Sequence, residues 1–189
     1  MASVVGICNR ALSKIGDEIG ITSINDDLKP ARYCKLLYAD TRDYVLRSYP
    51  WRFALKQWRL APIEEKPVFG FENAFQLPAE CLSVWRPENP DDNYGVYGRT
   101  VHANGIVFGF VGCARIEDPT LFDPMFADAL SLRLAYELVP ALAGDMNLKN
   151  FLMQEFELRV KEARRASAIE SPRAVFEMKP DWVTAHYGA

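Results

Sequence analysis

The sequence predicts an α+β fold in which a small antiparallel β module is inserted into a four-helix body, followed by an extended C-terminal tail. Three observations predict it. Apolar residues recur at helical spacing up to about residue 48, short β-type runs replace them between residues 51 and 111, and helical spacing returns from residue 123. We therefore divide the chain into an N-terminal helical pair (1–50), a β-rich module (51–117), two C-terminal helices that complete the body (118–170) and an extended tail (171–189).

The first fifty residues predict two helices that pair antiparallel. In the first helix, which ends near Gly16, apolar residues at alternating spacings of three and four share one face: Val5, Cys8, Leu12 and Ile15. The second helix starts around Leu28, with Asp26 and Asp27 as candidate caps. Its inner stripe is Ala31, Cys34, Tyr38, Thr41 and Val45. Because a short connection separates the two helices, we expect them to lie side by side.

A proline ends the second helix. Pro50 has no backbone N–H and disfavours helical geometry at Tyr49, so the helix must stop there. Trp51 and Phe53 follow at once. We expect Pro50, Trp51 and Phe53 to form a structural corner between the helical pair and the β module.

The β module is predicted from clusters of Trp, Phe, Val and Tyr that Pro and Gly separate about every eight to twelve residues. The clearest local signal is Asn104-Gly105 between 100–103 and 106–108, which favours a two-residue hairpin turn. Residues 87–97 are expected to form an exposed loop or hairpin tip. Three glycines are predicted to be turn and bulge residues rather than a nucleotide cradle, namely Gly105, Gly109 and Gly112.

Two longer helices follow. Asp123-Pro124 predicts an N-cap and first turn, and the helix extends to Pro140 or slightly beyond. Apolar residues nearly surround it, which predicts a central place in the helical body. The last helix, from about Asp145 to Ala168, has one apolar face and a basic end, where cations interact favourably with the helix dipole.

The periodic pattern stops after Ser171-Pro172. The segment that follows still contains four large apolar residues, which a free polar tail would lack: Phe176, Met178, Trp182 and Tyr187. We expect it either to fold back on its own domain or to dock on a partner.

The composition excludes several classes of protein. A net charge of −3 argues against a protein that holds nucleic acid by neutralising phosphates. The four cysteines form no CxxC pair, so we expect no zinc site and reduced thiols, as in the cytoplasm. No stretch has the pattern of a signal peptide or the length of a membrane span, and no cofactor is expected.

No constellation of residues predicts catalysis, and we expect a protein that is not an enzyme. His102 and His186 have no triad partners, and the carboxylate pairs suit caps, solvated faces and loop tips. Trp51, Trp58 and Trp85 are predicted to be core residues. Basic residues interleave with them, and we expect a rim or subunit contact from Arg52, Lys56, Arg59 and Arg86.

The order of these blocks resembles the tail tubular protein A family of short-tailed bacteriophages, related to the head-to-tail adaptors of other tailed phages. The resemblance covers the chain to about Ala168. It is carried by Ala11-Leu12 with Ile15-Gly16, by Asp43 to Leu46 leading into Pro50 to Ala54, by Leu77 to Cys81, and by Asp118-Pro119 through Leu134-Ala135. The glycine-containing stretch 107–112 departs from the regular strand that the family pattern leads us to expect.

The resemblance implies a structural virion protein that forms a ring, typically of twelve copies, beneath the portal. Such a ring connects the DNA-filled head to the tail, surrounds a channel that double-stranded DNA crosses during ejection, and carries the next tail component, a tubular protein B-like nozzle. It implies assembly in the host cytoplasm and residence in the phage neck. The tail would dock on the portal or on a neighbouring subunit through Arg173, Phe176, Met178, Trp182 and Tyr187.

Two other functions are alternatives to a head-to-tail adaptor. The first is a virion-associated glycan hydrolase on the same fold, which requires two acids opposed across a cleft. The second is a small DNA-binding regulator, which requires a helix-turn-helix with a basic recognition helix.

Overall fold

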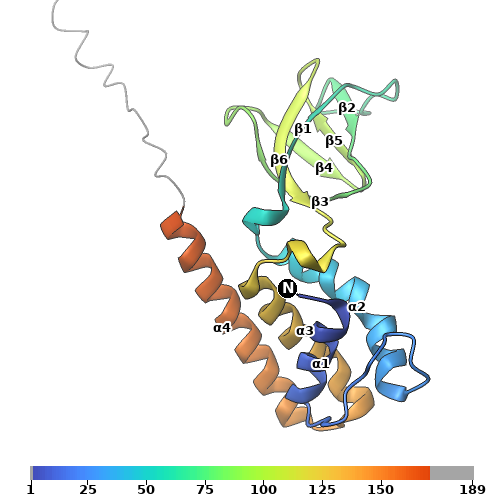
Figure 1. The fold of residues 1–189 in the computed structure, drawn as a ribbon. Helices are drawn as coiled ribbons and strands as arrows, with labels where there is room; N and C mark the ends of the chain where they lie inside the picture. Colours follow the sequence, from blue (N-terminus) through green and yellow to red (C-terminus); the bar gives the residue numbers. More distant parts are fainter. Residues whose placement is uncertain (1, 171–189) are drawn as a thin grey trace, which may run out of the picture.

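The computed structural model describes residues 2–170, so the predicted docking residues Arg173, Phe176, Met178, Trp182 and Tyr187 lie outside the described residues. The described chain has the predicted α+β class, with four α-helices and two three-stranded antiparallel sheets. Figure 1 shows the helices gathered at one end and the strands at the other.

The helices are α1 (Val4–Lys14), α2 (Lys29–Ser48), α3 (Pro124–Leu142) and α4 (Met146–Glu170), with short 3-10 turns at Arg52–Ala54 and Pro119–Leu121. The strands are β1 (Leu55–Leu60), β2 (Asn73–Gln76), β3 (Cys81–Pro87), β4 (Tyr94–Tyr97), β5 (Thr100–Ala103) and β6 (Phe108–Ala114). One sheet has the order β1-β6-β3 and the other β2-β5-β4.

The ends of α1 and α2 follow from local hydrogen bonding. Gly16, with φ +86°, reverses the chain after α1, and the Asp17 amide donates to the Leu12 carbonyl at 3.0 Å, as in a Schellman motif. Leu28 is the N-cap residue of α2 and makes no side-chain cap. The expectation that Asp26 or Asp27 caps this helix is wrong: Asp26 accepts from the amides of the preceding loop, and Asp27 pairs with Arg32 at 2.8 Å.

Helix α3 is the centre of the helical body, as its all-round apolar character predicts. Asp123 caps it by accepting from the Met125 amide at 2.8 Å. Helices α1, α2 and α4 each pack on α3, and α1 has little contact with α2. We expected α1 and α2 to pack mainly on each other, and this is wrong. Both helices bury their inner faces on α3, because α3 is the most apolar helix.

The predicted Asn104-Gly105 hairpin is also wrong. Strand β5 pairs with β2 and β4, whereas β6 pairs with β1 and β3, so the two segments belong to different sheets. The two-residue turn is instead Gly98-Arg99, where Tyr97 faces Thr100 and Gly98 has φ +60°. A positive φ at the first turn residue alone is typical of a type II′ hairpin.

Residues 107–112 do not interrupt the sheet, because most of them belong to its central strand, β6. Gly112 pairs with Val84, beside a register shift in β3, where a Cβ atom would lie 2.5 Å from the Ser83 carbonyl oxygen. The glycine thus lets a bulged strand approach closely. The exposed connection predicted over 87–97 is confined to 88–93, since β3 extends to Pro87 and β4 begins at Tyr94.

Each half of the chain has its own hydrophobic core. The helical core includes Leu12, Leu46, Phe126, Leu130, Leu134, Leu138, Leu152 and Phe156, together with Trp51, Ala54 and Cys113 from outside the four helices. The core of the β module consists of Phe75, Leu77, Cys81, Val101, Ala103, Phe108 and Phe110. Trp51, at the start of the β-rich segment, is therefore buried with the helices.

The aromatic corner packs the exit of α2 against the start of α3. Trp51 is 3% exposed, and its indole Nε1 donates to the Val45 carbonyl at 2.8 Å. Its ring meets those of Tyr49 and Phe126 edge to face, with centroids 5.2 and 5.1 Å away. Phe53 adds a further contact with Phe126 at 5.1 Å. Pro50 follows Tyr49, the C-cap residue of α2, and prevents the helix from continuing.

Replacing Trp51 by alanine is expected to lower the free energy of unfolding by about 3 to 5 kcal/mol, the usual cost of deleting a buried large aromatic side chain. Trp85 was expected in the core, but this is wrong, since it is 49% exposed at the surface of β3. It therefore provides the matched control: Trp85→Ala is expected to cost about 1 kcal/mol or less. Urea unfolding of both variants measures the difference, and equal losses would contradict the role of the corner.

Gly112→Ala is expected to destabilise the fold by about 1 to 3 kcal/mol, because the added methyl group meets backbone that cannot move without shifting β3. A Cβ atom at Gly105 lies 3.2 Å from its nearest neighbour, so Gly105→Ala should cost less. Thermal unfolding of the two variants compares their stabilities directly. A smaller loss of stability in Gly112→Ala than in Gly105→Ala would show that β3 can shift to make room for the methyl group.

Candidate functional site

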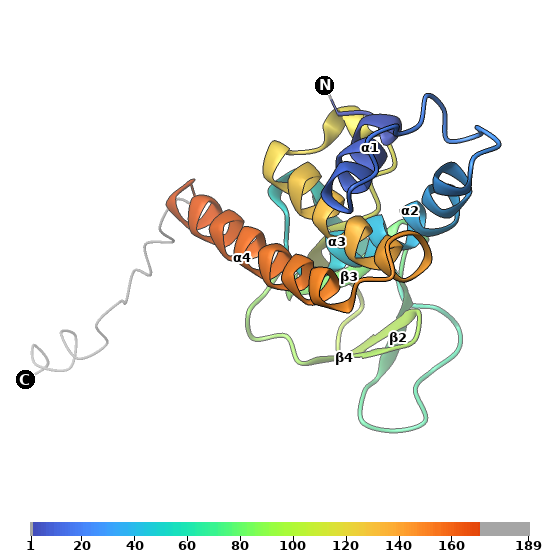
Figure 2. The same ribbon diagram turned by 90° about the horizontal axis from the view of Figure 1, so that it is seen from below.

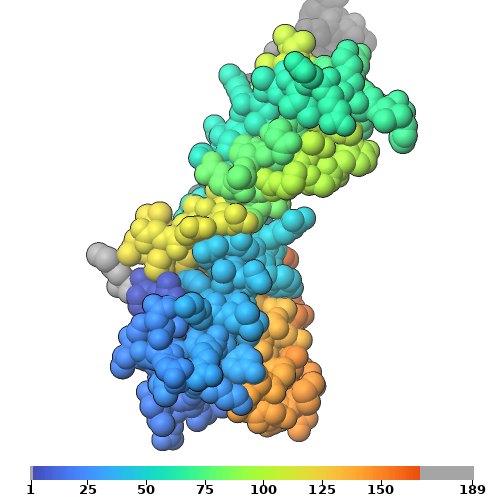
Figure 3. Space-filling model, turned by 90° about the vertical axis from the view of Figure 1, so that its right-hand side faces the viewer, coloured from blue at the N-terminus to red at the C-terminus, as the bar shows by residue number. Residues whose placement is uncertain are grey.

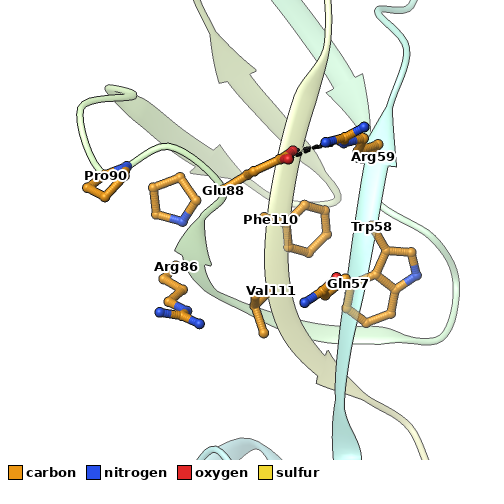
Figure 4. Close-up of a pocket in the computed structure, with 9 residues that line it drawn as sticks. Gln57, Trp58, Arg59, Arg86, Glu88, Pro90, Phe110 and Val111 are labelled. Carbon is orange, nitrogen blue, oxygen red and sulfur yellow. Dashed lines mark hydrogen bonds and ion pairs between the residues drawn. The ribbon is translucent and has the colours of Figure 1, made fainter. Parts of the chain in front are cut away.

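A groove of about 690 Å³ crosses the outer face of the β1-β6-β3 sheet. We call it the β-module groove. Figure 4 shows the side chains of the three strands and of the loop after β3 around it. Its lining residues are Gln57, Trp58, Arg59, Arg86, Pro87, Glu88, Pro90, Phe110 and Val111.

An ion pair closes one end of this groove. Arg59 donates through Nε to Glu88 Oε2 at 2.9 Å and through Nη2 to the other carboxylate oxygen. The pair reaches across β6 at Gly109, which is the register partner of Arg59, and the Glu88 amide donates to the Gly109 carbonyl at 2.8 Å. Any side chain at Gly109 would collide with the Glu88 carboxylate, so the glycine creates the room for the ion pair.

Two aromatic rings pack on the opposite face of the sheet. Trp58 and Phe110 are cross-strand partners, and because side chains alternate along a strand they point away from Gln57, Arg59 and Val111 and into the core of the β module. Their rings stack with centroids 5.1 Å apart and an interplanar angle of 24°. Lys56 lies 5.7 Å from the Trp58 ring and pairs with Glu80 at 2.6 Å. The groove face of the sheet combines charged side chains with the apolar Val111, which suits contact with a protein segment better than proton transfer.

The electrostatics of the groove differ from those of a glycosidase site. Glu88 provides the one carboxylate among the lining residues, and its hydrogen bonds with Arg59 lower the pKa of this group. A catalytic general acid requires a raised pKa and a second, opposed carboxylate. The groove therefore does not support the alternative function of a glycan hydrolase.

The basic residues singled out in the sequence lie at different places. Arg59 and Arg86 line the β-module groove, Lys56 lies beside Trp58 on the other face of the sheet, and Arg52 lines a small hollow at the corner. Of the four residues, the structure brings Arg59 and Arg86 together, and the expected rim or subunit contact stays a prediction. His102 lies on the other sheet, with its ring 4.6 Å from that of Tyr97.

Exposed apolar side chains gather at the end of the β module away from the helices. Val68 and Phe69 are 95% and 84% exposed in the loop 61–72, and Ile106 is 84% exposed in the loop 104–107. The two loops are tied together, since the Glu72 amide donates to the Asn104 side-chain oxygen at 3.1 Å. We call 61–72 and 104–107 the distal loops; they project at the upper end in Figures 1 and 3.

The distal loops were not singled out from the sequence. A signal was present, because Val68-Phe69 precedes Gly70, which has φ +86°, and a turn at this place exposes its apolar residues. Neighbouring large apolar groups at one exposed end of a soluble domain mark an interaction surface.

A second feature that the sequence did not reveal is a stack of rings around Arg133. The guanidinium lies 4.3 Å from the Tyr44 ring and 4.6 Å from the Tyr136 ring, and it pairs with Glu137 at 2.6 Å. It also contacts Met153 Sδ at 3.4 Å. Arg133 therefore links α2, α3 and α4. In the sequence, only its i,i+4 spacing from Glu137 indicated an ion pair on α3.

The four cysteines are buried and free, as expected for small apolar residues. Burial raises the pKa of the Cys113 thiol to about 12, which disfavours the reactive thiolate. Within residues 2–170, no His, Cys, Asp or Glu side chains gather in groups of three that could hold a metal ion. None of the helices in this range combines the length and apolar character that crossing a bilayer requires.

Comparison with known proteins adds no relative: no protein-family model matches the chain, and no curated protein sequence matches it.

Replacing Arg59 by glutamine is expected to raise the pKa of Glu88 to its ordinary value, because the bonds that favour the carboxylate are lost. In the wild type the folded-state pKa is depressed, so the pair stabilises the fold above the unfolded-state pKa and loses this contribution as pH falls through the folded value. NMR titration of side-chain carboxyl carbons measures the shift.

Asp26 is the internal control for this titration. Its pKa is lowered by bonds from the Ser23 and Thr22 amides, which are remote from the groove, and should not change in Arg59→Gln. An unaltered Glu88 pKa in the variant would show that Arg59 does not hold the carboxylate in solution.

Proposed function

We propose that the protein is a head-to-tail adaptor of a short-tailed bacteriophage, a structural virion protein without enzymatic activity. Copies of the chain form a ring, twelve in the related adaptors, fixed beneath the portal in the phage neck. Double-stranded DNA passes through the channel of the ring during ejection. The other face of the ring carries the next tail component. Assembly takes place in the cytoplasm of the host.

The observation that supports this proposal most is the division of one chain into two cored parts at opposite ends (Figure 1). A connector has to present separate surfaces to two partners and keep them at a fixed separation. The helical body supplies one end, and the β module supplies the other. The chain order of these parts is the order on which the resemblance depends.

The distal loops support a protein contact at the end of the β module. Val68, Phe69 and Ile106 are almost fully exposed, and such groups are stabilised when a partner covers them. We assign this end to the next tail component. The helical body then faces the portal, and the C-terminal residues Arg173, Phe176, Met178, Trp182 and Tyr187 dock on the portal or on a neighbouring subunit.

The charge of the chain suits a channel for moving DNA. A protein of net charge −3 does not hold DNA by releasing counterions from many phosphates. DNA can therefore slide past such a subunit without being retained.

Deleting the residues after Ser171 tests the proposal. The truncated chain should fold but fail to join filled heads, and the yield of infectious particles should fall about 100-fold or more, since a loss of ~3 kcal/mol in docking lowers affinity by that factor. Plaque counts from a phage that carries the truncation measure the yield, and circular dichroism checks the fold.

The matched control for tail length is a full-length variant in which four residues are replaced by serine: Phe176, Met178, Trp182 and Tyr187. This variant should fail to join heads to the same degree as the truncated chain, because the large side chains supply the contact. A truncated protein that completes infectious particles would contradict the proposed docking.

A further inference from the structure

Helix α4 presents an apolar stripe that no other element covers in the described part of the chain. Phe151 and Leu158 are 56% and 46% exposed and are seven residues apart, so they lie on the same side of the helix. Gln154, between them, is also exposed. The inner residues Leu152 and Phe156 are already buried against the helical core. The stripe therefore faces away from the body.

A shallow hollow lies on α2. It measures about 440 Å³ and is lined by Lys29, Arg32, Tyr33 and Leu36. Leu36 is 68% exposed, although it is a large apolar residue in the middle of a helix. Leu28, at the N-cap of this helix, is 45% exposed beside it.

The stripe and the hollow lie on different sides of the helical body. Helix α4 lies on one side of α3 and α2 on the other (Figures 1 and 2), and α2 forms much of the lower face in Figure 3. Both surfaces belong to the end of the body away from the β module, since α2 and α4 each begin there (Figure 1). Two copies placed side by side at the same height would thus bring one stripe to one hollow.

The two surfaces differ in charge. The first part of α2 carries Lys29, Arg32 and Lys35, and the exposed Asp27 pairs with Arg32. The stripe segment 150–158 contains Glu155 and Glu157, and the cations at its two ends are engaged elsewhere, since Lys149 lies 4.6 Å from the Tyr136 ring and Arg159 pairs with Asp128 and Glu162. Arg32 already pairs with Asp27, but both side chains are exposed, at 68% and 94%, and such a pair exchanges partners at little cost.

We propose that the stripe of α4 in one copy of this chain packs into the hollow of α2 in the next copy. Phe151 and Leu158 cover Leu36 and Tyr33, and the glutamates of α4 face the cations of α2. Because the two surfaces differ, the contact is heterologous and repeats from copy to copy. The inference rests on the proposed function only in taking the covering partner to be a second copy.

Disulfide trapping tests this contact. All four native cysteines are buried, so cysteines introduced at exposed positions react selectively. Gln154→Cys lies within the stripe, and Ala39→Cys lies one turn from Leu36. Mixed in equal amounts and oxidised, the two variants should give a large excess of mixed dimer over random pairing, read by intact mass. Ser13→Cys, exposed on α1, is the matched control with Ala39→Cys and should pair at random.

A further substitution in each cysteine variant distinguishes the apolar part of the contact from the charged part. Phe151→Asp in the Gln154→Cys chain should reduce the mixed dimer to the random level. Glu157→Lys should lower the excess, and Lys35→Glu in the Ala39→Cys partner should restore it, because the opposite charges then meet again.

Random pairing of Gln154→Cys with Ala39→Cys would overturn the proposal, as would an excess that Phe151→Asp leaves unchanged. An excess that Glu157→Lys does not alter would overturn the charge pairing that selects a second copy as the partner. None of these readouts involves a portal or a head. A trapped contact without portal binding would refute the adaptor function alone, and portal binding with random pairing would refute this contact alone.

Discussion

The position of the β module depends on the aromatic corner, where Trp51 is buried between Tyr49 and Phe126 and its indole N–H bonds to the Val45 carbonyl. The chain leaves the helical body at this point and returns close by. On the return, the Cys113 thiol contacts the Leu46 carbonyl at 3.2 Å, and Arg115 pairs with Asp43 at 2.7 Å. Both crossings are therefore held to the last turns of α2, and the β module is attached by two neighbouring anchors rather than by one linker.

This double attachment gives the molecule two ends whose separation is set by the fold. Helix α3 begins beside the corner, so the packing that centres the helical body also supports the start of the β module. The Arg133 stack holds α2 and α4 to α3 from another side. The distal loops and the outer faces of α2 and α4 are consequently presented from one connected framework, which is what a connector between two assemblies requires.

The sequence predicted those parts of the fold that local chemistry determines. Asp123-Pro124 marked the start of α3, and Pro50 marked the end of α2. Turn propensity failed at Asn104-Gly105, because Phe108 and Phe110 are needed in the core beside Trp58, and β6 therefore pairs with β1 and β3. The β-module groove could not be predicted either. Its residues come from 57–59, 86–90 and 110–111, which no periodic pattern connects, and the room for its ion pair depends on the missing side chain of Gly109.

The mass of the purified protein in solution, measured by light scattering alone and after mixing with portal rings of the same phage, shows whether the chain assembles on a portal. We expect the protein alone to be present as single copies and small oligomers, and to convert on the portal to a ring with a fixed number of copies. A mass that stays the same in the presence of portal rings would contradict the assignment of this chain as a head-to-tail adaptor.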